Sequence, residues 1–152
     1  MDAVDQLMAK QACAEVIARY ARAVNERDVE RFVHLFTEDA SWNRPGAHSM
    51  VGHDEIRDFI DYALPDPAER TLRHVNGATL IELVDDDTAT SWSQTIVYDT
   101  PEGGQYPVSL PGPDMVVEYR DRLVRQGDQW LIALRDTTVL FAASELPRPR
   151  ED

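Results

Sequence analysis

The feature that most constrains this fold is a change in hydrophobic period at Pro67. Before this residue, apolar side chains recur every three to five positions, which is the spacing of one buried face of a helix. After it, apolar and β-branched residues recur every second position, as in a strand. Helices followed by strands can bury their apolar faces by packing helices on one face of a sheet. The sequence therefore predicts an α+β fold.

Three helices are expected before Pro67. The first carries an apolar stripe to about Asn25, and a second, short helix begins after Asp28, a favourable N-cap residue. A short strand over 39–42 separates it from a third helix, for which Asp54 is interpreted as the cap. The prolines from position 65 onward end this third helix.

The remaining chain predicts four long strands and two tight turns. The turns are Asp-Asp-Asp at 85–87 and Gln-Gly-Asp at 126–128, and both favour antiparallel hairpins. A loop at 100–114, rich in proline and glycine, separates the two hairpins. Loops of this length in compact domains are often functional. The expected strands cover residues 72–84, 88–98, 115–125 and 130–141.

We expect one domain over residues 1–145, followed by a loose tail at 146–152. The last strand alternates apolar residues on both of its faces. One face can pack on the helices or line a cavity, while the other needs a different cover. We therefore predict a homodimer formed through the sheet.

The net charge of −13 bears on the partners. A strongly acidic surface repels phosphate backbones and anionic lipids, so we expect no nucleic acid and no membrane partner. The only cysteine, Cys13, lies in a helical apolar pattern and has no internal disulfide partner. A buried free thiol is typical of a reducing compartment, which predicts a cytoplasmic protein.

The sequence contains no motif of nucleotide, metal or nucleophile chemistry. A phosphate-binding glycine loop, a serine elbow and paired cysteines are all absent, and the four histidines lack ligand spacing. We therefore expect no metal and no cofactor. Acid–base chemistry in a dry pocket remains, because it needs only one or two titratable groups.

His74 is the main candidate for such chemistry. It lies on a predicted strand, on the same face as Leu72 and Asn76. A histidine in this setting is also commonly a hydrogen-bonded core residue, and both interpretations stay open here. Other candidates for the same pocket are Tyr20, Asn25, Trp42 and Arg135.

Six segments together resemble the SnoaL-like families of the nuclear transport factor two-like superfamily. They cover about residues 5–142 in a consistent order. The resemblance implies a cone-shaped fold, in which three helices pack on a strongly curved antiparallel or mixed sheet that encloses an apolar pocket. The segments are IARYARAVNERD (17–28), LFTEDA (35–40), GHDEI (52–56), RHVNG (73–77), YRDR (119–122) and DQWLI (128–132).

The chain is most similar to the branch of scytalone dehydratase and hexachlorocyclohexane dehydrochlorinase. There, a strand histidine removes a proton and an aspartate at the end of the first helix orients it. The resemblance gives His74 the role of the histidine, but places Asn25 where the family has aspartate. It gives Arg135 a position facing the leaving group and Trp42 a position in the pocket wall.

We therefore expect a cofactor-independent enzyme acting on a small, largely apolar molecule by proton transfer, as a dehydratase, an isomerase or a polyketide-type cyclase. The catalytic residues would be His74 and Asn25, and Tyr20, Trp42, Arg135 and Tyr119 would contact the substrate.

Two alternatives follow from the same residues. One is a non-catalytic ligand-binding or assembly protein, because Asn25 brings no charge to the histidine. The other is a water-activating Asp–Arg–Asp site of the epoxide hydrolase kind, drawn from 120–122 and 135–136. Adjacent residues of one strand point to opposite faces, which argues against this second alternative.

Overall fold

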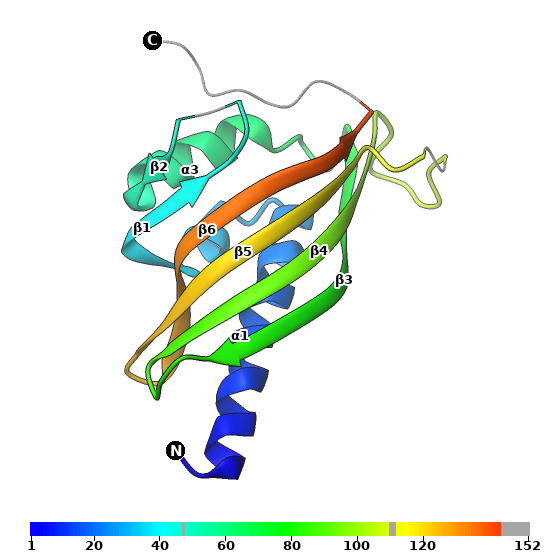
Figure 1. The fold of residues 1–152 in the computed structure, drawn as a ribbon. Coiled ribbons are helices and arrows are strands. Elements are labelled where there is room, and N and C mark those ends of the chain that lie inside the picture. The colour runs from blue at the N-terminus through cyan, green and yellow to red at the C-terminus, as the bar shows by residue number, and fades with distance from the viewer. Residues whose placement is uncertain (47, 110–111, 144–152) are drawn as a thin grey trace.

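Three helices pack on one mixed six-stranded sheet (Figure 1). The computed structural model describes residues 1–46, 48–109 and 112–143. The expected domain boundary at 145 and the tail at 146–152 lie outside the described residues. The elements are α1 (Ala3–Asn25), α2 (Val29–Val33), β1 (Phe36–Asn43), β2 (Met50–Val51), α3 (Gly52–Ala63), β3 (Thr71–Leu83), β4 (Thr88–Thr100), β5 (Met115–Gln126) and β6 (Gln129–Ala142).

The helices begin where the sequence predicts them, with one correction. The Asp28 side chain accepts a hydrogen bond from the backbone N–H of Arg31 and caps α2, as expected. The prediction that Asp54 caps α3 is wrong. The N-cap residue is Val51, whose backbone N–H donates to Glu55, while Asp54 lies in the first turn and pairs with Arg57. No helix among the described residues is long and apolar enough to cross a membrane.

The sheet has the strand order β2-β1-β6-β5-β4-β3. Both predicted hairpins are confirmed, because β3 pairs with β4 and β5 with β6 in antiparallel register. The β5–β6 turn uses Gly127 at φ +61°, a left-handed conformation that glycine adopts without steric cost. Among the described strands, only β1 and β6 pair in parallel, with Trp42 opposite Arg135. The sheet is therefore mixed, one of the two forms that the resemblance left open.

Interruptions of the strand register accompany the curvature of the sheet. One lies on β3 between Asn76 and Thr79, and another separates the pairs Arg122–Leu134 and Leu123–Ile132 on β5 and β6. Such bulges bend a strand and increase its twist. The sheet curls around α1 in consequence (Figure 1). Its concave face and the helices form the core, where Cys13 is fully buried as expected.

The convex face of the sheet carries exposed apolar side chains. Val75 on β3 is opposite Ile96 on β4, and both are exposed at 49% and 37%. Leu80 on β3 and Phe141 on β6 are exposed at 55% and 71%. The expected homodimer depends on these exposed apolar side chains, because a second copy of the chain could cover them.

Candidate functional site

A cavity of about 160 Å³ opens between the concave face of the sheet and helices α1 and α3. Four of the six predicted site residues line it: Tyr20, Trp42, His74 and Tyr119. Loop residues 101–109 do not line it, although Asp99 and Asp114 on either side of the loop do. The wall is mainly apolar, with Phe59, Ile60, Leu64, Leu72, Val97, Met115, Val117 and Val139.

Asn25 and His74 meet where the end of α1 crosses β3. The Oδ1 atom of Asn25 accepts the backbone N–H of His74 at 2.7 Å and lies 3.3 Å from the Nδ1 atom of its ring. A backbone N–H can only donate, so the shared atom of Asn25 must be the oxygen. The same oxygen can accept from Nδ1 only if that nitrogen carries the proton. This arrangement leaves Nε2 of His74 as the unprotonated, basic nitrogen.

Burial lowers the pKa of His74 to about 4, and the positive charge of Arg135 lowers it further in the same direction. The ring is therefore neutral at pH 7 and able to accept a proton. A conjugate acid with a pKa about 4 also makes it a weaker base than free imidazole. Asn25 orients the ring but supplies no charge to stabilise the imidazolium.

Arg135 is a predicted site residue that lies in a buried ion pair. It is fully buried, and its guanidinium lies over the rings of Tyr20 and Tyr119 at 4.0 and 4.1 Å. Two hydrogen bonds of 2.7 Å join it to Asp121, which also accepts from Ser91. Arg135 is absent from the cavity wall. In this structure Arg135 supports the two tyrosines, and its implied position facing a leaving group stays a prediction.

This ion pair also bears on the Asp–Arg–Asp alternative. Asp121 and Arg135 do share the concave face, but they come from neighbouring strands rather than from one strand. Burial by itself would lower the pKa of Arg135, yet the facing carboxylate outweighs burial and raises it. Asp136 hydrogen-bonds Asn43 instead of this arginine. An Asp–Arg–Asp site needs two aspartates at the arginine, and Asp121 is the one that pairs with Arg135 here.

Trp42 and the tyrosines form one aromatic wall. The Trp42 indole N–H donates to the Thr137 hydroxyl at 2.9 Å, and its ring meets those of Tyr20 and Phe59 edge-on. Burial, and then Tyr20, raise the pKa of Tyr119, so the Tyr119 hydroxyl stays protonated and can donate a hydrogen bond. These positions agree with the expected wall of the pocket.

Arg44 also lines the cavity, and the sequence interpretation missed it. It follows β1 directly and lies two residues beyond Trp42. Because side chains two apart in a strand share a face, the alternation that placed Trp42 in the pocket could have identified Arg44 as well.

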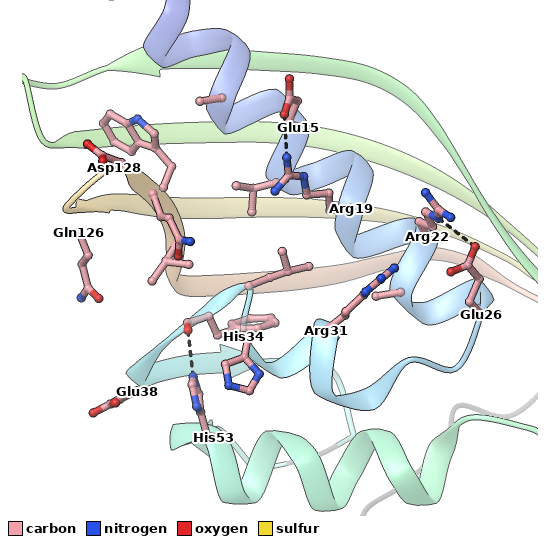
Figure 2. Close-up of a pocket in the computed structure, with 18 residues that line it drawn as sticks. Glu15, Arg19, Arg22, Glu26, Arg31, His34, Glu38, His53, Gln126 and Asp128 are labelled. Atoms are coloured by element: carbon pink, nitrogen blue, oxygen red, sulfur yellow. Dashed lines mark hydrogen bonds and ion pairs between the residues drawn. The ribbon is translucent and has the colours of Figure 1, made fainter.

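A second groove, of about 830 Å³, lies between α1, α2, β1 and the β5–β6 turn (Figure 2). None of the predicted site residues lines it. Its three arginines are paired locally: Arg19 with Glu15, Arg22 with Glu26, and Arg31 with Asp28. No group of three possible metal ligands occurs in this groove or elsewhere in the described part of the chain.

The comparisons with known proteins agree with this geometry. The SnoaL-like domain family matches residues 5–136. No curated protein matches the sequence significantly. Among solved structures, a variant of Rv3472, a protein of unknown function from Mycobacterium tuberculosis, is 27% identical over 91% of this chain and 76% of its own, with a TM-score of 0.74.

Two further neighbours share the fold. Hexachlorocyclohexane dehydrochlorinase LinA-type3 from Novosphingobium barchaimii is 14% identical, covers 92% of each chain and has a TM-score of 0.73. An NTF2-like protein with a cystatin-like fold from Novosphingobium aromaticivorans is 23% identical over 89% of this chain and 84% of its own, with a TM-score of 0.71. At these identities the likeness establishes the fold alone.

Proposed function

The chain belongs to the SnoaL-like domain family, and we propose that it is a cofactor-independent enzyme that transfers a proton on a small, largely apolar molecule. Dehydration, isomerisation and polyketide-type ring closure all begin or end with such a step. His74 serves as the acid–base residue and Asn25 as its positioning partner. Tyr20, Trp42 and Tyr119 hold the substrate.

One observation carries this proposal. A single oxygen of Asn25 engages both the backbone and the ring of His74, and the ring lies on the wall of the cavity. The contact with Nδ1 makes Nε2 the basic nitrogen of a ring that lines the cavity. A neutral histidine with a fixed tautomer beside a cavity supports a role in general base catalysis.

The cavity volume limits the size of the substrate. An engineered apolar cavity of about 150 Å³ in another protein binds benzene. The present cavity, at about 160 Å³, accordingly has space for one six-membered ring with small substituents. Its aromatic and aliphatic wall favours a largely apolar ring.

Proton transfer can be tested without knowing the natural substrate. We expect the protein to accelerate exchange of the acidic C–H of cyclohexanone in D₂O, followed by NMR, because removal of a proton from carbon is common to all three reactions. His74→Gln should lose about 10²-fold of this acceleration, the lower range for general base catalysis. His34→Gln, at a histidine whose side chain is 67% exposed, is the matched control. Equal exchange by the native protein and His74→Gln would contradict the assignment.

A second candidate is a non-catalytic protein that binds a small apolar ligand, and Asn25 favours it. A neutral partner leaves His74 with a pKa about 4, which is low for a base that must work near neutrality. This candidate predicts ring-sized ligands that bind in the cavity while no C–H exchange occurs with any of them.

We also propose a homodimer through the convex face of the sheet. Light scattering at micromolar concentration should give the mass of two chains, because a partner copy would cover Val75 and Ile96. Ile96→Arg should shift the mass to one chain, since the interface would then bury an unpaired charge. Val4→Arg, at a residue exposed at 68% on α1, is the control. A stable native monomer would exclude this interface.

The proposed location is a reducing compartment such as the cytoplasm. The only cysteine is buried in α1, and burial raises the pKa of its thiol to about 11, so it stays protonated and unreactive.

A further inference from the structure

Arg44 presents a buried, unpaired hydrogen-bond donor beside the proposed catalytic cavity. Its Nε atom is enclosed and has no hydrogen-bond partner, and the side chain lines the cavity. Enclosing a donor without a partner costs free energy, and such groups in native structures usually mark a missing water or ligand.

Arg44 contacts an aromatic ring, which stabilises its positive charge without accepting a hydrogen bond from its N–H groups. The guanidinium carbon lies 4.7 Å from the centre of the Phe59 ring, a cation–π contact. The N–H bonds of a guanidinium lie in its plane and match a planar oxygen group. The contact with Phe59 occupies none of these N–H donors with a hydrogen-bond acceptor, so the terminal N–H groups of Arg44 can bind such a group.

The rest of the wall complements this donor. Tyr20 and Tyr119 line the same cavity and interact electrostatically with Arg44. Burial raises the pKa of Tyr119, so its hydroxyl stays protonated. Of the two carboxylates that line the cavity, Asp99 is already paired with Arg70 at 3.0 Å. Burial lowers the pKa of Arg44, an indication that water solvates this cation incompletely.

We propose that Arg44 binds an anionic oxygen group of the ligand, so that the cavity takes a ring-sized organic anion such as an aromatic carboxylate or an acidic phenol. The ring lies against Trp42 and Phe59, and the charged oxygen meets the edge of Arg44. This inference uses the same cavity as the proposed function and specifies the class of its ligand. Arg44 is a specificity residue here, distinct from His74.

Binding of three probes tests the inference: benzoate, para-nitrophenolate and the neutral benzyl alcohol, measured by NMR or calorimetry at low salt. A charge-assisted, partly buried ion pair should make benzoate bind at least about tenfold more tightly than benzyl alcohol. Arg44→Gln should abolish that preference and leave the affinity for benzyl alcohol within about twofold. Arg57→Gln, an arginine of α3 that pairs with Glu30, should keep the preference. Comparison of benzoate with para-nitrophenolate separates carboxylate from phenolate ligands.

Other outcomes overturn the inference. If the native protein binds benzoate no more tightly than benzyl alcohol, or if Arg44→Gln keeps the preference, Arg44 is not an anion-binding residue. If Arg44→Gln and Arg44→Met weaken all three probes equally, Arg44 serves only to pack against Phe59. His74→Gln separates this inference from the proposed function. His74→Gln should still bind benzoate more tightly than benzyl alcohol. If this variant loses C–H exchange but keeps that preference, the result concerns the catalytic role of His74 and leaves the role of Arg44 unchanged.

Discussion

Replacement of Asp121 by alanine is expected to lower the free energy of unfolding by about 3–5 kcal/mol, because it leaves Arg135 buried and charged without a partner. Both side chains are fully buried, and two hydrogen bonds of 2.7 Å join them. The guanidinium also lies over Tyr20 and Tyr119. Loss of the carboxylate should therefore loosen the aromatic wall of the cavity as well as the sheet.

Urea unfolding measures this effect, and two further variants make it specific. Glu118→Gln breaks the pair with Arg120, whose side chain is 70% exposed, and should lower the free energy of unfolding far less than Asp121→Ala. The double variant Asp121→Leu with Arg135→Met removes both charges and should recover most of the loss, since a buried pair can often be replaced by apolar residues. A cost below about 1 kcal/mol for Asp121→Ala would mean that water reaches Arg135.

This ion pair shows where prediction from the sequence ends. The sequence predicts the β5–β6 turn. If the strands paired regularly from Gln126 and Gln129 at that turn, Asp121 would lie opposite Leu134. The structure has one extra residue, Ala133, on β6 between the paired positions, which brings Arg135 opposite Asp121. A bulge depends on how the whole sheet curves, and no local residue pattern specifies it here. The strands were predictable, but the inward pairing of these charges was not.

The proposed site also contains some residues that the sequence predicts and one, Arg44, that it does not. His74 and Asn25 follow from a resemblance carried by short motifs, and Tyr20 follows from the helical stripe of α1, so these positions were predictable. Arg44 lies just beyond the predicted strand at 39–42, so the alternation of inward and outward side chains was not applied to it. Its proposed role depends on an Nε atom without a hydrogen-bond partner, which can be identified only once all neighbouring acceptors have been placed.

Asn25→Asp is expected to raise the pKa of His74 from about 4 toward or above that of free imidazole. Both hydrogen bonds from His74 end on Oδ1, an atom that aspartate retains in the same position. The added negative charge favours the protonated ring, so the direction of the change is upward. An NMR titration of the histidine ring between pH 3 and 8 measures it.

The same substitution should increase the rate of C–H exchange by about 10²-fold, the lower range for general acid–base catalysis. A charged partner stabilises the imidazolium that forms as the proton leaves carbon. The gain must disappear when Asn25→Asp is combined with His74→Gln, because the carboxylate acts only through the ring. Asn25→Ala, which releases the ring, should be slower than the native protein. If the pKa of His74 rises while exchange stays at the rate of buffer, the cavity binds ligands without catalysis, and the enzyme proposal fails in favour of the second candidate.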